Sequence, residues 1–531
     1  MDPRETDAYQ MVGQDIPWLL EHWAERKPDH PFLIWEPKSG TGRQWTYREF
    51  LTDVRRLAAG LLANGVSKGD KVLLHADNCP EGVIAWYACA TLGAAAVTTN
   101  TRSVAAEVEY FAEHTKCVAA ITQPQYAALV TEAARNVKWI AVTDDNSGEP
   151  APPEQLDHGH RSFDSLFGDA DQLPSRPAEP LLPAGIQFTS GTTSRPKAVV
   201  HTHGNAVWAS RIGPRNVDIT TDDVYLVYLP FFHVNAQSWS IWSTLGVGGT
   251  VVLQPKFSSS RFWDVVTRHG VTHISLLPFI IKALAGQPVP PNKLRVAQFG
   301  AIMPPFPMWP NLQIYACYGM TETVIHAIHG RPYDGMPNGV MGRPTPGYQV
   351  AIVDKETGEL CGEGQTGELW VRGIRGIQLF LEYYDNPEAN AKAFTEDGWF
   401  KTGDMVTLRA NGNIQYAERD KDLIKVGGEN VSARQVEDVC RQVPGISEIA
   451  VVGQSHEMLD QVVAAFVIKT PDAPDDDTMA EQIIATCREQ LADFKVPRAV
   501  YFVDEFPRAT LDKVAKNKLR EIADQKAAEA R

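Results

Sequence analysis

The chain contains 531 residues, which at roughly 150 residues per domain predicts about three to four folding units. Apolar residues make up 44% of the chain and charged residues 22%, a balance that is typical of globular enzymes and excludes disorder over most of the length. Fifty basic residues against 65 acidic residues give a net charge of −15, which disfavours nonspecific binding to nucleic acid. We therefore expect the function to reside in a local site that concentrates positive charge or a metal ion.

The seven cysteines indicate reduced thiols, because their number is odd and no two are spaced C-x-x-C. The first ten residues are polar and acidic, and no stretch reaches the roughly 18 apolar residues of a membrane span. These features predict a cytoplasmic protein with no integral membrane segment and no nucleic-acid partner.

Residues 16–140 alternate between helix-like and strand-like stretches. Apolar residues recur at helical spacing over 54–63 and 83–92, whereas the short apolar runs at 71–75 and 95–99 are typical of buried strands. Alternation of this kind predicts parallel sheets with crossover helices.

A long surface connection is predicted from 144 to 183, where Pro, Asp, Glu and Gly dominate. A second alternating stretch follows, with strand-like runs at 223–229, 250–253 and 273–277 and a helix-like segment at 260–269. This stretch predicts a second sheet of the same kind.

Between about 341 and 418 the pattern changes to short strands separated by Gly turns, at 348–353, 367–372 and 412–418. That spacing suits a small barrel or a sandwich. The chain after residue 422 alternates again, and we place a domain boundary near 419–422. Its predicted helices cover 435–441 and 478–491, and its predicted strands cover 449–452, 462–468 and 498–503.

The loop Phe188-Thr-Ser-Gly-Thr-Thr-Ser-Arg-Pro-Lys-Ala198 follows an apolar run and combines hydroxyls, a glycine and a lysine. Phosphates need this combination, because Gly allows close backbone approach, N–H and O–H groups donate, and the lysine supplies a mobile cation. A Walker A loop is excluded, since Pro196 stands where its second glycine is required. A solvated Ser/Thr turn is the alternative that composition alone leaves open.

This loop resembles the signature loop of the adenylate-forming superfamily, which includes acyl- and aryl-CoA synthetases, luciferases and the adenylation domains of peptide synthetases. The resemblance implies phosphate contacts from one set of residues: Thr189, Ser190, Gly191, Thr192, Thr193 and Lys197. The family usually has Gly where this chain has Ala198, and a methyl group there is expected to narrow the loop.

Tyr318-Gly319-Met-Thr321-Glu322 is similar to the family's second core motif. The resemblance implies that Thr321 hydrogen-bonds a phosphate or substrate oxygen and that Glu322 binds Mg²⁺, which takes one or two carboxylates and completes its octahedron with phosphates and water. A lone Thr-Glu pair would more often begin a helix. Its position and order favour the family's motif.

Gly398-Trp-Phe-Lys-Thr-Gly-Asp404 resembles the motif whose Asp accepts hydrogen bonds from both ribose hydroxyls; a carboxylate suits that role because it only accepts. By itself T-G-D would be a β-turn. In Glu418-Arg-Asp-Lys-Asp422 the resemblance places Arg419 on the ribose and Lys421 at a hinge, although a charged surface loop would have the same composition. Gly300-Ala301 matches the stretch that lies against the family's adenine ring, on weaker grounds.

The C-terminal run from Pro507 to Arg520 resembles the motif that carries the family's catalytic lysine, which aligns with Lys513. The family prefers Gly immediately before that lysine, whereas this chain has Asp512, a carboxylate that would tether or partly neutralise the ammonium. The matching motifs span Thr189 to Lys513 in the family's order, which is most of the chain.

Three further groups carry a functional and a structural interpretation. His233, in Pro-Phe-Phe-His, resembles a residue beside the acyl pocket, although a lone His among aromatics is most often packed in a core. Gly427-Gly428 resembles the stretch that approaches the thiol's entry tunnel, and a simple hairpin turn is nearly as good an interpretation. For the H-x-H pair His201 and His203 we favour packing over metal binding, because no third ligand is in view.

The resemblance implies ATP-dependent activation of a small-molecule carboxylic acid as an acyl-adenylate, release of pyrophosphate, and transfer to coenzyme A, with ATP, Mg²⁺ and coenzyme A as the small molecules involved. The loop Thr-Thr-Ser-Arg-Pro-Lys together with Gly427-Gly-Glu-Asn is most similar to the carnitine/crotonobetaine-CoA ligase branch. Three alternatives stay open: an aryl-acid ligase or a relative that passes the adenylate to another nucleophile, an enzyme that loads a separate carrier protein, and a non-catalytic nucleotide-binding relative.

The fold class that follows is mixed α/β. We expect a large N-terminal adenylating domain over residues 1–418, built from two α/β sheet subdomains and a small β-barrel subdomain at about 341–418. A hinge at 419–422 would lead to a small, mobile α+β C-terminal domain over 423–531 that carries Lys513. The assembly state is open, with a homodimer as one option.

Overall fold

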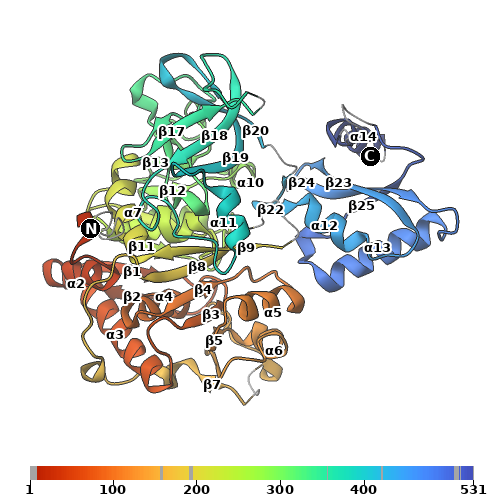
Figure 1. Ribbon diagram of the computed structural model, residues 1–531. Coiled ribbons are helices and arrows are strands. Elements are labelled where there is room, and N and C mark those ends of the chain that lie inside the picture. Colours follow the sequence, from red (N-terminus) through yellow and green to blue (C-terminus); the bar gives the residue numbers. More distant parts are fainter. Residues whose placement is uncertain are drawn as a thin grey trace.

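The computed structural model of the protein describes residues 9–155, 159–189, 195–355, 357–419, 423–507, 514 and 516–529. Two large sheets with their helices form the body of the molecule, and a smaller antiparallel sheet lies against it (Figure 1). The C-terminal elements form a separate lobe beside this body. The mixed α/β class predicted from the sequence is confirmed.

The first sheet has seven strands in the order β7-β6-β5-β3-β4-β8-β9, parallel except for the last strand. Its central strands form because short runs of Ala, Val, Leu and Ile are buried on both faces, as parallel sheets require. Its strands are β3 (Lys71–His75), β4 (Ala95–Thr98), β5 (Ala119–Thr122), β6 (Ile140–Val142), β7 (Arg161–Ser162), β8 (Pro183–Thr189) and β9 (Lys197–Thr202).

The second sheet has nine strands in the order β16-β15-β14-β13-β12-β10-β11-β1-β2. Strands β14, β13, β12, β10, β11 and β1 are parallel neighbours, so their carboxyl ends share one edge, where ligands usually bind in such sheets. Its strands are β1 (Pro31–Trp35), β2 (Arg43–Thr46), β10 (Val224–Val227), β11 (Thr250–Leu253), β12 (His273–Ser275), β13 (Val296–Phe299), β14 (Gln313–Tyr318), β15 (Ile328–Gly330) and β16 (Arg343–Pro344).

Helices cover and separate the two sheets. They are α2 (Ile16–Arg26), α3 (Tyr47–Ala63), α4 (Pro80–Leu92), α5 (Ala105–His114), α6 (Pro124–Ala133), α7 (His203–Asn216), α8 (Ser243–Leu245), α9 (Phe262–His269) and α10 (Pro278–Leu284). Over 144–182 the described residues of the predicted connection form β7, short 3-10 turns and an isolated bridge between Asp145 and Pro150.

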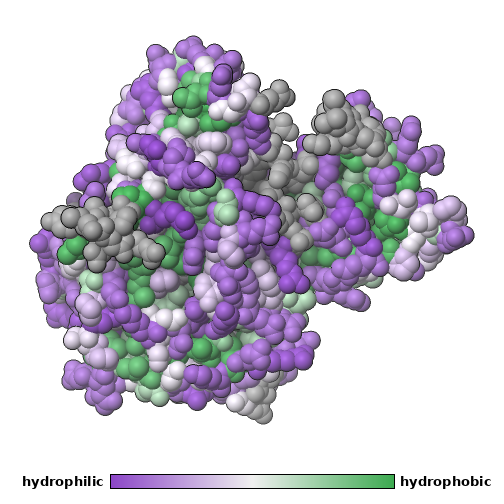
Figure 2. Space-filling model, in the orientation of Figure 1, coloured by the Kyte–Doolittle hydropathy of each residue, from purple (hydrophilic) through white to green (hydrophobic). Residues whose placement is uncertain are grey.

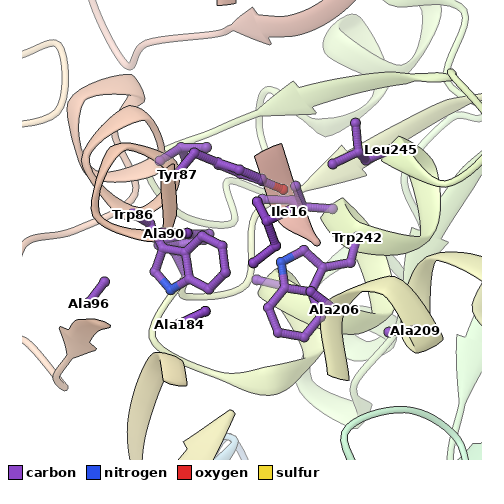
Figure 3. Packing of buried hydrophobic residues seen from close by; sticks show 14 of the residues in the cluster. Ile16, Trp86, Tyr87, Ala90, Ala96, Ala184, Ala206, Ala209, Trp242 and Leu245 are labelled. Carbon is purple, nitrogen blue, oxygen red and sulfur yellow. The ribbon is translucent and has the colours of Figure 1, made fainter. Parts of the chain in front are cut away.

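One hydrophobic core joins both sheets (Figure 3). Trp86 of α4 packs against Trp242 with their ring centroids 5.5 Å apart, and both indoles are almost completely buried. Trp242 closes a π-helix, η5 (Asn235–Trp242), a rare element that is frequent at functional sites. The core therefore fixes the segment that begins just after His233.

The segment predicted as a barrel is an open sheet in the order β17-β18-β19-β20. In the described ranges β17 and β20 are not paired with each other, and isolated bridges extend the sheet on both sides, from Gly342 to Ile414 of β20 and from Leu360 to Val353 of β17. The strands are β17 (Gln349–Val353), β18 (Thr366–Arg372), β19 (Trp399–Leu408) and β20 (Ile414–Arg419), with α11 (Pro387–Ala393) inserted between β18 and β19.

The C-terminal lobe has its own sheet, in which β22-β21-β24-β23 follow one path and β25 pairs with β24. Two hydrophobic clusters consist entirely of residues from this lobe, one under α12 and α13 and the other under α14. Its elements are β21 (Leu423–Val426), β22 (Glu429–Ser432), α12 (Ala433–Cys440), β23 (Ile446–His456), β24 (Asp460–Lys469), α13 (Asp476–Gln490), β25 (Ala499–Phe502) and α14 (Lys516–Glu529).

The outer surface on the face seen in Figure 2 is mostly hydrophilic, and its hydrophobic residues gather in separate small patches. In the ranges given above, no helix is long and apolar enough to cross a bilayer.

Candidate active site

The hydroxyl-rich loop connects β8 to β9, and its two limbs are held together because Thr189 and Lys197 are paired across the antiparallel ladder. The Oγ1 atom of Thr189 is buried and has no hydrogen-bond partner among the described residues, which suits a ligand oxygen. Ser190, Gly191, Thr192 and Thr193 lie outside the described residues. Tyr110 Oη of α5 donates to the carbonyl of Pro196 at 3.0 Å and anchors the second limb.

Lys197 and Glu322 meet at one aromatic ring. The Lys197 ammonium lies 4.5 Å from the centroid of the Tyr383 ring, and Tyr383 Oη donates to Glu322 Oε1 at 2.8 Å. Burial first, and then the neighbouring Glu322 carboxylate, hold the pKa of Tyr383 well above its usual range, so the phenol remains a donor. The Tyr383 ring thereby brings the Lys197 ammonium and the buried Glu322 carboxylate together at the end of the hydroxyl-rich loop.

Glu322 sits on a constrained turn after β14. The short 3-10 helix η6 (Thr321–Thr323) ends at Val324, a β-branched residue with φ of 66°, where only glycine is comfortable. His201 Nε2 lies 2.8 Å from the Thr321 carbonyl oxygen, and burial lowers the pKa of His201 to about 4, so the ring is neutral and donates. His201 is thus a packed residue that holds the turn.

His203 is also buried, with Nδ1 accepting from the Ile16 amide at 3.3 Å. In the part of the chain that the structure describes, no three His, Cys, Asp or Glu residues are grouped as a metal site. Both histidines of the H-x-H pair are buried and hydrogen-bonded to the backbone of other segments.

Asp404 joins the same site from the small sheet. Tyr318 Oη donates to Asp404 Oδ2 at 2.7 Å, and both side chains are buried. Asp404 and Arg419 are direct partners on β19 and β20, so their backbones are adjacent. Thr402-Gly403-Asp404 lies within β19 at a register irregularity, with Gly403 at φ of 75°, and so is a bulge and not the isolated β-turn that composition suggested.

Gly300 follows β13, the parallel neighbour of β14, so Gly300-Ala301 and the Tyr318-Gly319 segment leave the sheet at the same edge. A methyl group on Gly300 would meet nothing within 4 Å, whereas one on Gly319 would lie 2.7 Å from the Ile325 carbonyl oxygen and 3.0 Å from the Trp239 ring. Gly300 therefore borders open space, and Gly319 permits the close packing of Trp239.

His233 faces the C-terminal lobe. Its Nε2 lies 3.2 Å from Glu429 Oε2, and the amide of Asn100 donates to the same oxygen at 3.1 Å. Burial alone would raise the pKa of Glu429, but His233 first, then Arg102 and Lys495, hold that pKa below its usual value. The 40% exposure of the His233 side chain leaves the ring partly open.

Gly427 and Gly428 form the turn between β21 and β22, with φ of 58° and 89°. A methyl group on Gly428 would lie 3.3 Å from Leu277, which follows β12 in the body. The structure places this hairpin against the body near His233. Gly427-Gly428 is therefore a hairpin turn that also lies close to the body, so the two interpretations made from the sequence are compatible.

The remaining sequence-based candidates are placed as follows. The side chain of Arg419 is not described, and Lys421, Asp512 and Lys513 lie outside the described residues. Ala198 is buried in a hydrophobic cluster with Ile186 and Val200, so its methyl group packs in the core. Tyr383, Asn100 and Glu429 were not singled out from the sequence, although Glu429 directly follows the paired glycines.

Two family models match the chain: "AMP-binding enzyme" over residues 20–384 and "AMP-binding enzyme C-terminal domain" over residues 435–513. The chain belongs to the AMP-binding enzyme family. A curated relative of this family member is the crotonobetaine/carnitine–CoA ligase of Citrobacter koseri, which is 32% identical over 529 residues and matches 96% of this chain and 99% of its own. The resemblance to the adenylate-forming superfamily and to its carnitine/crotonobetaine-CoA ligase branch is confirmed.

Solved structures agree with the family assignment. This AMP-binding enzyme superposes on o-succinylbenzoate CoA synthetase from Bacillus subtilis bound to the product analogue OSB-NCoA with a TM-score of 0.81, at 27% identity and with 95% and 98% of the two chains covered. The same synthetase in complex with AMP gives a TM-score of 0.66, at 27% identity and 94% and 98% coverage. The chain is therefore an enzyme of the adenylate-forming CoA ligase family.

Proposed function

We propose that this enzyme uses ATP to convert a small polar carboxylic acid into an acyl-adenylate and then transfers the acyl group to the thiol of coenzyme A. One observation carries the proposal, a chain of contacts between residues up to 215 positions apart. Thr189 is paired with Lys197, whose ammonium lies over the Tyr383 ring, and Tyr383 donates to Glu322. Tyr318, four positions before Glu322, donates to Asp404. These residues provide donors, a cation, a buried carboxylate and a second carboxylate for one nucleotide.

In the first step a carboxylate oxygen of the acid attacks the α-phosphorus of ATP, the bond to the bridging oxygen breaks, and pyrophosphate leaves. An anion approaches a polyanion, so catalysis depends on positioning and on cations aimed at the developing charge. Thr189 and Lys197 are suited to the phosphates, and Lys513 is the candidate for the charge at the reacting phosphate. Asp404, with its orientation fixed by Tyr318, would accept from the ribose hydroxyls, and Arg419 would donate to a ribose oxygen.

Glu322 fits a magnesium site, because its buried carboxylate is held at one oxygen by Tyr383 and carbonyl and hydroxyl groups of Thr321 lie next to it in sequence. Bound Mg²⁺ supplies charge neutralisation to the phosphates. Tyr383 fixes the carboxylate before any ion arrives, which is a typical role for a group behind a metal ligand.

In the second step the thiol of coenzyme A loses its proton to solvent and its sulfur attacks the acyl carbon. A carbon–sulfur bond forms, and AMP leaves with the electron pair of the broken carbon–oxygen bond. The proximity of His233, Glu429 and the Gly427-Gly428 turn supports thiol entry between the body and the C-terminal lobe. We propose a boundary at 419–422 between a domain of residues 1–418 and a mobile domain of residues 423–531, with Lys421 at the hinge.

We assign the buried donors of η5 and β13 to one wall of the acyl pocket, and these donors support a polar acid. Trp239 Nε1, Gln298 Nε2 and Ser238 Oγ are buried without hydrogen-bond partners in the described ranges. Trp239 and Gln298 both contact His326, whose pKa burial lowers to about 3, so this wall is neutral. Unpartnered donors in a wall favour a substrate that carries hydrogen-bond acceptors.

A panel of acids assayed for AMP formation with and without coenzyme A tests the proposal, with crotonobetaine and carnitine as polar members and benzoate as the aryl member. We expect AMP formation that depends on coenzyme A and is faster with the polar acids. Acid-dependent exchange of pyrophosphate into ATP without any turnover of coenzyme A would favour another nucleophile or a separate carrier protein. Absence of exchange with every acid would favour a non-catalytic relative.

The variant Lys513→Ala checks the assignment of the lysine. Losing one such charge should slow acid-dependent pyrophosphate release by about 10²–10³-fold. Lys518→Ala, which changes an exposed residue in the first turn of α14, is the matched control and should retain the wild-type rate. Equal rates for Lys513→Ala and wild type would remove Lys513 from this role.

We further propose that the enzyme acts in the cytoplasm, where ATP and coenzyme A are both present. The residues assigned above all come from one chain, so the proposal is satisfied by a monomer or by a homodimer. Light scattering coupled to size-exclusion chromatography measures which of the two forms.

A further inference from the structure

A buried ion pair joins the C-terminal lobe to the body. Lys495 Nζ, at the end of the short 3-10 helix η9 (Asp493–Lys495), lies 2.5 Å from Glu107 Oε1 in the first turn of α5. The two side chains are 7% and 6% exposed, although they belong to different lobes and are 388 positions apart. Their burial therefore depends on the contact between the lobes.

The ion pair is one of two polar contacts in which the C-terminal lobe and the body each contribute one partner. The lobe supplies Lys495 to Glu107 of the body, and it supplies Glu429 to His233 of the body. Next to the pair, the guanidinium of Arg102 lies 5.8 Å from the centroid of the Phe494 ring. Glu107 Oε2 is buried and has no hydrogen-bond partner in the ranges that the structure describes. Among those residues, Lys495 is the one cation that pairs with the Glu107 carboxylate.

Charges buried in this way discriminate between placements of the lobe. An ion that leaves water loses several kcal/mol of solvation, and only a partner at contact distance compensates for it. When the lobe occupies the observed placement, both ions are paired; when it moves, both return to water. A placement that buried only one of them would be strongly disfavoured.

The observed placement is more similar to one of two solved forms of a single relative. The o-succinylbenzoate CoA synthetase structures with OSB-NCoA and with AMP cover almost the same share of this chain at the same identity, yet the first superposes better. Because the two structures share one sequence family and one fold, the difference lies in how their parts are arranged.

We propose that Lys495 and Glu107 form a latch that holds the C-terminal lobe in the placement used for acyl transfer to the thiol. The inference rests on the proposed function, in which the same lobe must also deliver Lys513 during adenylation. Lys495 and Glu107 are positioning residues, because their effect on the reaction passes through the placement of the hairpin at Gly427-Gly428. The latch is closed in the second step and open in the first.

A comparison of the two half-reactions tests the latch, using the acid of the panel above with the fastest AMP formation. Adenylation is measured as single-turnover pyrophosphate release without coenzyme A, and transfer is measured by mixing the preformed acyl-adenylate complex with coenzyme A. Glu107→Gln should slow transfer by about tenfold or more and change adenylation by less than about twofold. Asp476→Asn, which removes an exposed ion pair with Lys469 inside the same lobe, is the matched control and should change neither rate.

A double-mutant cycle separates the pair from a general loss of packing. Lys495→Met should slow transfer as Glu107→Gln does, and the double variant should be no slower than the slower single variant, because the second change removes a charge already left unpaired. Additive losses in transfer, or equal losses in both half-reactions, would overturn the proposal.

A distance measurement that needs no substrate tests the latch even if the enzyme activates no acid of the panel. Spin labels on cysteines introduced at Glu109 of α5 and Glu481 of α13, both exposed, report the distance between body and lobe in a Cys361→Ser background. We expect a short-distance population in this protein that Glu107→Gln depletes and Asp476→Asn leaves intact. An unchanged distance distribution in Glu107→Gln would overturn the latch, whatever the outcome for the proposed function.

Discussion

At the scale of single residues, Glu322 carries a clear prediction. The substitution Glu322→Gln keeps the hydrogen bond from Tyr383 but removes the charge that Mg²⁺ requires. We expect acid-dependent pyrophosphate release to fall by about 10²–10³-fold and its magnesium dependence to move to higher concentrations. Titrations of Mg²⁺ at saturating ATP measure both quantities.

Tyr383→Phe is the control for Glu322→Gln, because it retains the carboxylate and loses only the group that orients it. Its effect should be about tenfold or less. If Glu322→Gln keeps the wild-type rate and magnesium dependence, Glu322 is not the magnesium ligand.

A second prediction at this scale concerns Asp404. Asp404→Asn replaces one acceptor oxygen by an amide that can only donate, so one ribose hydroxyl would lose its partner. Hydrogen bonds to a charged group contribute about 1.5–3 kcal/mol, so KM for ATP should rise by roughly 10- to 100-fold. Steady-state kinetics with varied ATP measure this, and Tyr318→Phe, which retains the carboxylate, should give a smaller rise. An unchanged KM in Asp404→Asn would contradict the ribose assignment.

The sequence was sufficient to propose Thr189, Glu322 and Asp404 for one site, because each lies in a short motif that resembles a motif of the adenylate-forming superfamily. Tyr383 and Asn100 could not be found in this way. Tyr383 acts through Glu322 across 61 positions, and Asn100 acts through Glu429 across 329 positions. Contacts of this range depend on the packing of whole lobes, which local patterns do not encode.

At the scale of elements, the turn at Gly428 gives a prediction about transfer. Gly428→Ala introduces a methyl group at a residue with φ of 89° and places it 3.3 Å from Leu277. Both the backbone of the turn and its packing against the body are therefore strained. Transfer to coenzyme A should slow by about tenfold, whereas adenylation should change by less than about twofold. Separate assays of the two half-reactions measure the split.

Gly358→Ala is the matched control, because Gly358 also has a positive φ, of 74°, but a methyl group there meets nothing within 4 Å. The control isolates backbone strain from the contact with the body. A uniform slowing of both half-reactions in Gly428→Ala would contradict the role given to this turn.

The helices and strands were predicted correctly where apolar residues recur at regular spacing. The prediction failed where the backbone conformation depends on contacts with other parts of the fold. The strand at Lys71–His75 matches its prediction at both ends, and α3, α4, α12 and α13 lie where helical spacing indicated. The π-helix Asn235–Trp242 was missed, since its register is imposed by packing around Trp242 and has no period of its own in the sequence. The bulge at Gly403 looked like a turn because both conformations require glycine.

At the scale of the whole molecule, buried histidines predict how stability depends on pH. Burial lowers the pKa of His75, His201 and His273 to about 4, from an ordinary value of 6.5 that applies to the unfolded chain. Between these values the unfolded state binds more protons, so stability is complete above about pH 6.5 and is lost as the pH falls toward 4. Thermal unfolding midpoints from pH 7.5 to pH 5 should therefore decrease steadily.

His75→Asn tests the sign of this effect, because it removes one titrating ring and retains a polar group for Thr99. At pH 5 the contribution of one such histidine is on the order of 1–2 kcal/mol, so the variant should lose less stability between pH 7.5 and pH 5 than the unaltered protein. Identical slopes would show that His75 does not remain neutral in the fold.

The ionic character of the contact between α5 and the C-terminal lobe has a consequence for the durability of the enzyme. The movement proposed for the lobe would expose a lysine, a glutamate and an arginine at this contact, which are charged groups and do not form the apolar patches that promote aggregation. A contact made of such groups would tolerate repeated opening in a crowded solution without promoting aggregation.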